Sequence, residues 1–358
     1  MKFSTSVARL VVASSLLILA TSVQARPVQF QLNRPAASEV FLAGEMTDWE
    51  KGKKAMTRGA DGRWQVRVDL SPGQWVYKFV VDGEWIADPA TGQNDSDGQG
   101  GRHSFVFSGD GPWRDQPRIA HGRVETTMLP SAAWGKPMKV NVYLPPGFRK
   151  SRAYPVLLLL HGSDMDADQW YRTGQVQRYM DNLIADHSIT PFVVVMPSSG
   201  GVYYVDRSDT HISQELPRWL QSRYGQTLAA AHTAAAGMSM GGFGAVILPL
   251  HHPDLFGLGY ALSAYFPPEQ VAAMVIPKPL PFTLLMVTGD HDHVTPSALP
   301  FLARLKENAA QYSYREDAGA HTWNFWSLHM ADTLRSISQY FVAAKLAPTA
   351  PLPPKDPS

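Results

Sequence analysis

The stretch "AAAGMSMGGFGA" (residues 234–245) decides how the rest of the chain is interpreted. Small residues lead into the pattern G-x-S-x-G, formed by Gly237, Ser239 and Gly241. A strand-like run precedes the serine, and residues 241–252 continue as an apolar helix. A nucleophilic serine on a sharp strand-to-helix turn needs very small neighbours two positions away on each side, and the glycines provide them. We therefore predict that Ser239 is a nucleophile beside a helix N-terminus, which favours negative charge.

A serine nucleophile needs a base and a carboxylate that orients the base, in the chain order Ser, Asp or Glu, His for such a sheet. His321 lies in a small-residue loop before the last helix and is the predicted general base. Asp290 and Asp292 follow a buried strand and compete as the acid. We favour Asp292, because a turn after Gly289 aims it back at His321. Weaker alternatives are Glu316 and Asp317.

The oxyanion hole is predicted from the buried strand and loop "LLLLHGSD" (157–164). In this kind of site, one backbone N–H comes from such a loop and the other from the residue after the nucleophile. We assign the first N–H to Ser163 or Gly162, and the second to Met240. His161 is expected to brace the loop and not to transfer protons.

From about residue 120, buried apolar strands alternate with amphipathic helices, which indicates an α/β domain with a mostly parallel sheet. The expected strands are residues 139–144, 154–162, 191–197, 232–237, 258–263 and 282–289. The expected helices lie within residues 169–185, 212–224, 241–252, 300–312 and 324–345.

Residues 26–108 are predicted to form a small antiparallel β-sandwich of immunoglobulin-like size. Apolar and polar residues alternate over 38–46, 62–70 and 74–83, and "DG" and "SPG" turns separate these stretches. The polar, Gly- and Pro-containing residues 109–119 are a predicted linker, so the α/β domain is expected to cover residues 120–345.

The two ends of the chain are expected to lie outside the folded domains. Residues 1–25 combine an early lysine, an apolar run and small residues, which predicts a secretory signal peptide cleaved after Ala25. The run is too short to span a membrane comfortably, so we expect an exported protein, either periplasmic or secreted. The proline-rich residues 346–358 are expected to be disordered.

Composition argues against several functional classes. The 32 basic and 31 acidic residues leave a net charge of +1, without the basic footprint of a nucleic-acid-binding protein. There are 0 cysteines, which excludes disulfides and a cysteine nucleophile. No Walker-type or dinucleotide-binding glycine motif occurs in the expected context, so we expect no nucleotide cofactor. The segments "DHDH" (290–293) and "HH" (251–252) contain residue types that bind metals. If residues 290–293 are extended, however, His291 and His293 point to one side and Asp292 to the other. We therefore expect no metal.

Aromatic residues near these motifs predict a pocket for an acyl or aryl group. The residues considered are Trp170, Tyr203, Tyr204, Phe266, Trp323 and Trp326. Trp323 is also expected to support the loop that carries His321.

Residues 120–345 resemble the esterase D and feruloyl-esterase-like group of α/β hydrolases, which includes mycolyltransferases and enterochelin esterases. Five stretches carry the resemblance in the right order: "VNVYLPPGF", "YPVLLLLHGSDMDADQW", "GMSMGGFGA", "TGDHD" and "GAHTWNFW". The resemblance implies an α/β-hydrolase fold and a triad of Ser239, His321 and Asp292, the last being the aspartate of G-x-x-D. The chain departs from the group in "AAHTAAAG" (230–237), where an arginine is often found.

Residues 38–92 are similar to the glycogen-binding modules of branching enzymes and of AMP-activated kinase β subunits. In those modules two tryptophans stack on glucose rings and a lysine bonds the sugar, which implies Trp49, Trp85 and Lys78 here. A further polar contact of that group falls at His103 or Ser104. The resemblance implies either glucan binding or a docking and scaffold role.

Together these features predict an exported serine carboxylesterase that hydrolyses acyl or aryl esters of a carbohydrate, such as feruloyl or acetyl esters, through an acyl-enzyme. The expected partners are that ester substrate and a polysaccharide. Three alternatives remain: a periplasmic siderophore esterase of the enterochelin type, an acyltransferase, and a non-catalytic carbohydrate-binding protein. The intact serine, histidine and aspartate set disfavours the last.

Overall fold

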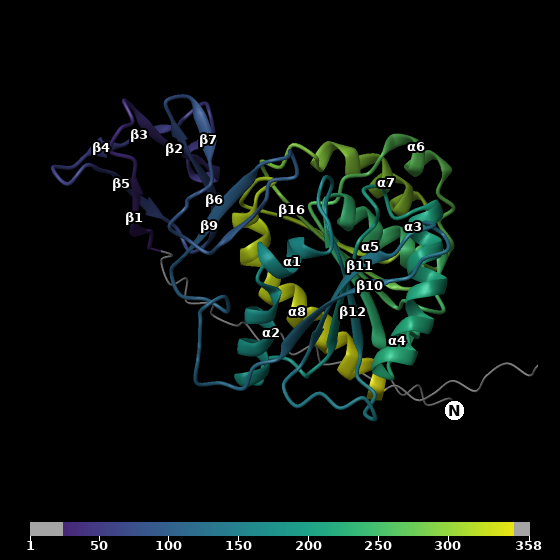
Figure 1. Cartoon of the computed structure of the whole chain (residues 1–358). Coiled ribbons are helices and arrows are strands. Elements are labelled where there is room, and N and C mark those ends of the chain that lie inside the picture. The colour runs from purple at the N-terminus through teal and green to yellow at the C-terminus, as the bar shows by residue number, and fades with distance from the viewer. Residues whose placement is uncertain (1–23, 347–358) are drawn as a thin grey trace, which may run out of the picture.

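A computed structural model describes residues 24–346 of the chain (Figure 1). Residues 1–23 of the predicted signal peptide and residues 347–358 of the predicted tail lie outside the described residues. Within the described part of the chain, no helix combines the length and apolar character needed to cross a membrane.

An eight-stranded sheet forms the centre of the larger part of the molecule (Figure 1). In spatial order its strands are β10 (Arg123–Leu129), β11 (Met138–Leu144), β13 (Val193–Pro197), β12 (Val156–Leu160), β14 (Thr233–Met238), β15 (Leu258–Leu262), β16 (Thr283–Gly289) and β17 (Ser313–Asp317). From β13 to β17 all neighbours are parallel, whereas β10 and β11 pair antiparallel at one edge. Every residue of β12, β13 and β14 is buried, as is typical of strands covered on both faces.

Helices cover both faces of this sheet. They are α1 (Asp168–Arg172), α2 (Val176–Ala185), α3 (Asp206–Thr210), α4 (Leu216–Tyr224), α5 (Met240–His251), α6 (Pro268–Ala273), α7 (Thr295–Glu307) and α8 (Trp323–Leu346). Alternate residues of β12 face the two layers: Leu158 and Leu160 join one core with α4, α5 and α7, while Leu157 and Leu159 join the other with α1, α2 and α8. This arrangement is the α/β-hydrolase fold that the sequence predicted.

Some helix boundaries differ from the sequence-based expectation. The helix expected over residues 169–185 is two helices, because Gln175 adopts a left-handed conformation with φ 50° between α1 and α2. The helix expected over residues 212–224 is preceded by α3 and by one π-helical turn, η2 (His211–Glu215). A short 3₁₀ turn, η3 (Ala230–His232), leads into β14.

Residues Arg26–Ser108 form two antiparallel sheets, here called the β module. The first contains β1 (Arg26–Asn33), β5 (Arg63–Leu70) and β4 (Thr57–Arg58). The second contains β3 (Lys54–Ala55), β2 (Val40–Gly44), β6 (Gly73–Val81), β9 (Arg102–Ser108) and β8 (Asn94–Ser96), with β7 (Glu84–Ile86) paired to β6. The two sheets enclose a core to which β1 contributes Phe30 and Leu32, and β2 and β6 contribute Leu42 and Phe79.

The β module packs directly against the α/β part of the chain, beside α1 and the beginning of α8 (Figure 1). Strand β6 is buried on both faces, because Tyr77 and Phe79 face the module core while Val76 joins the core around α8. The expected linker takes part in this contact: the buried Trp113 stacks on Phe107 with ring centroids 6.0 Å apart.

Candidate active site

Ser239 occupies the turn between β14 and α5. Its backbone has φ 53° and ψ −120°, a conformation that costs roughly 1–3 kcal/mol and is held by surrounding contacts. The Ser239 N–H donates to the Leu262 carbonyl at 3.0 Å, and the Ser239 carbonyl accepts from Phe243 N at 3.1 Å. A Cβ on Gly241 would collide with the Leu160 carbonyl, and a Cβ on Gly237 with the carbonyl of Gly241. Both glycines are therefore required by this turn.

His321 and Asp292 meet in the loops that follow β17 and β16. The Nδ1 atom of His321 lies 3.0 Å from each carboxylate oxygen of Asp292. The Asp292 side chain is fully buried and also accepts from Val294 N at 3.0 Å. Burial works to raise the pKa of Asp292, yet the hydrogen bond and charge of His321, with the Val294 amide, hold that pKa below its usual value. Asp292 is therefore an ionised partner that fixes the imidazole through Nδ1.

The other carboxylates considered from the sequence serve elsewhere. Asp290 is exposed and bonds His291 Nδ1 at 2.7 Å and Gly319 N at 2.9 Å, so it ties the two loops together. Asp317 pairs with Arg315 at 2.8 Å. Glu316 accepts from the Tyr314 hydroxyl at 2.7 Å. Of the four carboxylates, the structure brings only Asp292 to His321 by a hydrogen bond.

The loop after β12 lies beside the serine. A Cβ on Gly162 would stand 3.7 Å from Ser239 Cβ, which puts the two backbones next to each other. The Gly162 N–H donates to Gln169 Oε1 at 2.8 Å, so of the two predicted loop donors the exposed Ser163 N–H is the one left available. The first amide of α5 belongs to Met240, directly after Ser239.

His161 braces this loop from within the core. Its Nδ1 bonds the Gly162 carbonyl at 2.7 Å, and its Nε2 accepts from Ser199 N at 2.9 Å. Burial lowers the pKa of His161, and the bond to Ser199 N requires Nε2 to be unprotonated. His161 is therefore a neutral structural side chain, as the sequence predicted.

The aromatic residues proposed for a substrate pocket are mostly buried. Trp170, Tyr204 and Phe266 are each at most 1% exposed, so these three interpretations are wrong. Trp170 Nε1 donates to the Leu160 carbonyl at 2.8 Å, and the Tyr204 hydroxyl donates to the His161 carbonyl at 3.0 Å. Both hold the loop after β12 instead of lining a cavity.

Three of the predicted aromatic residues remain close to the histidine or at the surface. Trp326 packs edge-on against the His321 ring, with centroids 4.9 Å apart, and Trp323 packs against Trp326 at 5.4 Å. Both tryptophans are less than 10% exposed, so they support the His321 loop. Tyr203 is half-buried, with its ring 6.3 Å from that of Tyr265, and is the member of the set that is not buried.

On the β module, Trp49 and Trp85 lie near each other. Their ring centroids are 6.5 Å apart, and Trp85 is 40% exposed, so the pair presents an aromatic surface. Lys78 is engaged by Asp97 in an ion pair, with only 14% of its side chain exposed. His103 and Ser104 are buried, and burial lowers the pKa of His103 to about 4. The lysine, the histidine and the serine therefore contribute to packing in this structure.

Metal binding finds no support in the geometry. Across residues 24–346, the structure contains no group of three or more His, Cys, Asp or Glu side chains arranged to hold a metal ion. Asp209 bonds both His251 and His252, and His293 packs against His321 with centroids 5.0 Å apart.

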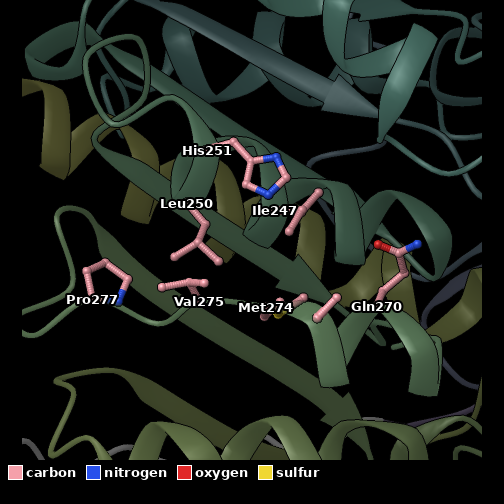
Figure 2. A pocket seen from close by; sticks show the side chains of 8 residues that line it. Ile247, Leu250, His251, Gln270, Met274, Val275 and Pro277 are labelled. Atoms are coloured by element: carbon pink, nitrogen blue, oxygen red, sulfur yellow. The ribbon is translucent and has the colours of Figure 1, made fainter.

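A separate pocket lies away from the serine. Figure 2 shows that it is bounded by the last turns of α5 and by α6 with the segment that follows it. It is lined by Ile247, Leu250, His251, Gln270, Ala273, Met274, Val275 and Pro277. Since Ser239 precedes the opposite end of α5, this pocket is not part of the arrangement around the serine.

Sequence reasoning missed two polar residues that hold the site together. Gln169 anchors Gly162, and Glu45 of the β module accepts from Trp323 N at 2.6 Å, two residues after His321. Gln169 lies within one of the stretches that carry the family resemblance, but nothing in that stretch marks its contact with Gly162. Their contacts depend on how α1 and the β module pack, so no local pattern could have identified them.

Comparison with known families agrees with this two-part architecture. Residues 131–283 match the family model described as "Putative esterase", and residues 26–102 match the glycogen recognition site of AMP-activated protein kinase. The chain therefore carries an esterase-family domain that follows a module of the glycogen-recognition type.

Individual relatives extend these matches. The chain is 28% identical over 271 residues to an endo-1,4-beta-xylanase/feruloyl esterase of Xylanibacter ruminicola, covering 67% of this chain and 36% of that protein. It is 31% identical over 164 residues to the MPT51/MPB51 antigen of Mycobacterium bovis, covering 43% and 50%. The chain thus spans between a third and a half of the length of these curated relatives.

A solved structure resembles both parts of the chain. The enterobactin esterase of Shigella flexneri, solved in the presence of 2,3-di-hydroxy-N-benzoyl-serine, superposes with a TM-score of 0.69 at 18% identity. The superposition covers 88% of this chain and 94% of that protein. At this identity the likeness concerns the fold, including the succession of β module and α/β sheet.

Proposed function

We propose that the chain is an exported serine carboxylesterase that acts on acyl or aryl esters of a carbohydrate. The observation that carries this proposal is Ser239 on a strained strand-to-helix turn, at the same sheet edge as the paired His321 and Asp292. The proposal includes a division into a signal peptide (1–25), a β module (26–108), a connecting segment (109–119), an esterase domain (120–345) and a tail (346–358).

The proposed reaction begins with proton transfer from Ser239. Nδ1 of His321 is held by Asp292 at 3.0 Å, so Nε2 is the nitrogen that takes the serine proton. The serine oxygen attacks the ester carbonyl, and the imidazolium then protonates the departing alcohol. Asp292 stays ionised and stabilises the imidazolium. Water, deprotonated by His321, releases the acid from the acyl-enzyme.

Two backbone amides are proposed to hold the oxyanion. They are the Met240 N–H at the start of α5 and the Ser163 N–H in the loop that Gln169 and His161 brace. Both amides are fixed before substrate arrives, so they need little rearrangement when negative charge develops. The dipole of α5 adds to this stabilisation.

The carbohydrate part of the proposal rests on the β module. Trp49 and Trp85 offer adjacent aromatic rings, and exposed rings of this kind stack on the apolar faces of sugars. The match of residues 26–102 to a glycogen-recognition family supports the same assignment, as does the relative named for feruloyl esterase and xylanase activities. We leave Lys78 out of the proposed sugar contacts, because Asp97 already binds it.

A siderophore ester is the second proposed substrate class. It is favoured by the shared two-part fold of the enterobactin esterase, which extends over 88% of this chain. Both substrate classes use the same proposed triad, so they differ only in the acyl and alcohol groups that enter the site.

The decisive experiment compares the purified protein with its Ser239→Ala variant. Hydrolysis of p-nitrophenyl acetate, methyl ferulate and enterobactin is measured, together with labelling by a fluorophosphonate. We expect turnover and labelling by the wild type, and a fall of about 10⁴-fold or more in the variant at an unchanged melting temperature. Equal turnover by the variant would refute the proposed nucleophile. The substrate with the highest kcat/KM decides between the two classes.

Sugar binding by the module is tested separately by titration calorimetry with maltoheptaose and xylohexaose. We expect Trp85→Ala to lose at least tenfold in affinity for the sugar that binds, since one stacking ring is removed. The exposed Val275→Ala, on the opposite part of the molecule, is the matched control. Absence of binding by the wild type would leave the module without a sugar-binding role.

A further inference from the structure

Glu45 reaches out of the β module to the first turn of α8. Its Oε1 accepts from Trp323 N at 2.6 Å, and its Oε2 from Asn324 N at 3.3 Å. The same Oε2 accepts from Val76 N of β6 at 3.3 Å. One carboxyl group therefore joins the module's own sheet to the beginning of the last helix.

The contact satisfies amides that the helix cannot satisfy itself. The first amides of an α-helix have no partner within the helix, and a carboxylate at that end also interacts favourably with the helix dipole. In α8, Phe325 N reaches the Thr322 hydroxyl at 3.3 Å, while Trp323 N and Asn324 N reach Glu45. The cap of α8 is thus divided between a neighbouring residue and one that comes from the other part of the molecule.

Glu45 itself is held firmly. It is the first residue of the 3₁₀ turn η1 (Glu45–Thr47), directly after β2. The Thr47 hydroxyl closes this turn by accepting from Gly44 N at 3.0 Å. A Cβ on Gly44 would stand 2.9 Å from Tyr77 Cα, so the turn lies close against β6. The carboxyl group is therefore presented from a rigid support.

The anchored amide lies two residues from His321. The side chains on this turn continue the connection, because Trp326 packs on the His321 ring at 4.9 Å and Trp323 packs on Trp170 at 5.5 Å. A shift of the Trp323 backbone would move the histidine relative to Ser239, while Asp292 would hold only the Nδ1 side of the ring.

We infer that Glu45 is a positioning residue for the proposed reaction: it fixes the loop that carries His321, and it makes the β module part of the catalytic apparatus. This inference rests on the proposed function, since it assigns His321 the role of base. Glu45 does not touch the reacting atoms and acts only through the start of α8.

The test compares Glu45→Ala and Glu45→Gln with Gln74→Ala as a matched control. Gln74 is buried at the same interface, and its side chain donates to the Thr173 carbonyl at 2.6 Å, away from the start of α8. For p-nitrophenyl acetate we expect Glu45→Ala to lower kcat about 10- to 100-fold with KM changed less than about twofold, because misplacement of a catalytic group acts on the chemical step. Glu45→Gln keeps one acceptor and is expected to recover part of that loss.

The control separates positioning from docking. Gln74→Ala is expected to lower the melting temperature while leaving kcat within about twofold of the wild type. If it lowers kcat as much as Glu45→Ala does, or if Glu45→Ala changes only the melting temperature, the inference is overturned. If Glu45→Ala does not fold, the comparison of Glu45→Gln with Gln74→Ala decides in the same way.

A second measurement keeps this inference distinct from the proposed function. Amide hydrogen exchange over residues 318–326 is followed by mass spectrometry in the same variants. We expect faster exchange in Glu45→Ala and no change there in Gln74→Ala. If the wild type turns over no ester, the proposed function fails, while unchanged exchange in Glu45→Ala would refute the anchoring role by itself.

Discussion

Ser239 and His321 are held in place by different means. The turn at Ser239 is held within the central sheet: Gly237 and Gly241 let β14, α5 and the β12 backbone come close, and the serine backbone bonds Leu262 of β15 and Phe243 of α5. The loop at His321 also has local contacts, such as the bond from Thr322 N to the Ala320 carbonyl at 2.9 Å, but it depends in addition on distant residues. It is held by Asp292, by the bond from Gly319 N to Asp290, and by Glu45 of the β module.

Each half of the proposed site is therefore sensitive to a different kind of change. A change at the serine turn acts through steric collision with the adjacent backbone of β12 and α5. A change at the histidine loop acts through the loss of contacts made by residues 29 to 278 positions away. The serine turn is thus held within the central sheet and its helix, whereas the histidine loop also depends on the docked β module.

The largest expected effect separates the two aspartates that hold the histidine loop. Asp292→Asn is expected to lower kcat by about 10³- to 10⁴-fold, because the amide no longer stabilises the imidazolium or its tautomer. Asp290→Asn, which changes only the tie to Gly319 and His291, is expected to cost less than about tenfold. Steady-state kinetics with p-nitrophenyl acetate measures both. Equal losses would mean that the two carboxylates share the role assigned to Asp292.

A change at the serine turn comes next. Gly241→Ala places a Cβ against the carbonyl oxygens of Leu160 and His161, so we expect a loss of at least about 1–3 kcal/mol in the free energy of unfolding and a fall in kcat. Gly92→Ala is the control, since a Cβ there meets no atom within 4 Å. Urea denaturation measures both variants. A Gly241→Ala midpoint equal to that of the control would contradict the close packing.

A smaller effect is expected at the loop after β12, which carries one of the proposed oxyanion donors. Gln169→Ala removes the acceptor of the Gly162 amide and leaves that buried N–H unpaired, so we expect about a tenfold loss in kcat from the displaced loop. Gln169→Glu keeps the acceptor oxygen and is expected to stay closer to the wild type. The control is Gln177→Ala, whose side chain bonds only Gln175. A kcat of Gln169→Ala equal to that of Gln177→Ala would refute the role of Gln169 in holding this loop.

The smallest effect concerns pH. Burial raises the pKa of Glu45 to about 7, although the amides of Trp323, Val76 and Asn324 act in the opposite direction. A raised pKa means that the folded state holds a proton which the unfolded state releases near the ordinary value of 4.5. The stabilisation is therefore complete below that value and is lost as the pH rises toward 7 and beyond.

Melting temperatures at pH 5 and pH 8 test this linkage. Glu45→Gln has no proton to lose at this position. When the pH is raised from 5 to 8, its melting temperature is therefore expected to rise by a few degrees relative to that of the wild type. A difference that does not depend on pH would show that the Glu45 carboxyl titrates at its ordinary value.

The sequence predicted the central part of the fold well. The expected strands at 258–263 and 282–289 differ from β15 and β16 by one residue at one end, because long apolar runs between helices have few other ways to be buried. It also predicted that Asp292 would meet His321, because a turn after Gly289 aims the aspartate back at the histidine, and the structure shows this hydrogen bond. The catalytic roles of these residues stay predictions until they are measured.

What the sequence did not predict depends on tertiary packing. The edge strands β10 and β17 are polar on much of their surface and carry no buried run. Trp170 and Tyr204 lie near the motifs in the chain, yet both side chains turn inward to bond backbone carbonyls. The role of Glu45 rests on the docking of two parts of the molecule, which no pattern around residue 45 contains.

The contact between Glu45 and Trp323 also bears on the order in which the parts of the molecule fold. The two residues are 278 positions apart, so the carboxyl group is made well before its partner. Chains generally fold domain by domain from the N-terminus, and contacts of such long range form late. The β module is therefore expected to fold before the last helix docks against it. A nascent chain that contains the module and the serine, but not yet the last helix, is therefore expected to lack the proposed activity.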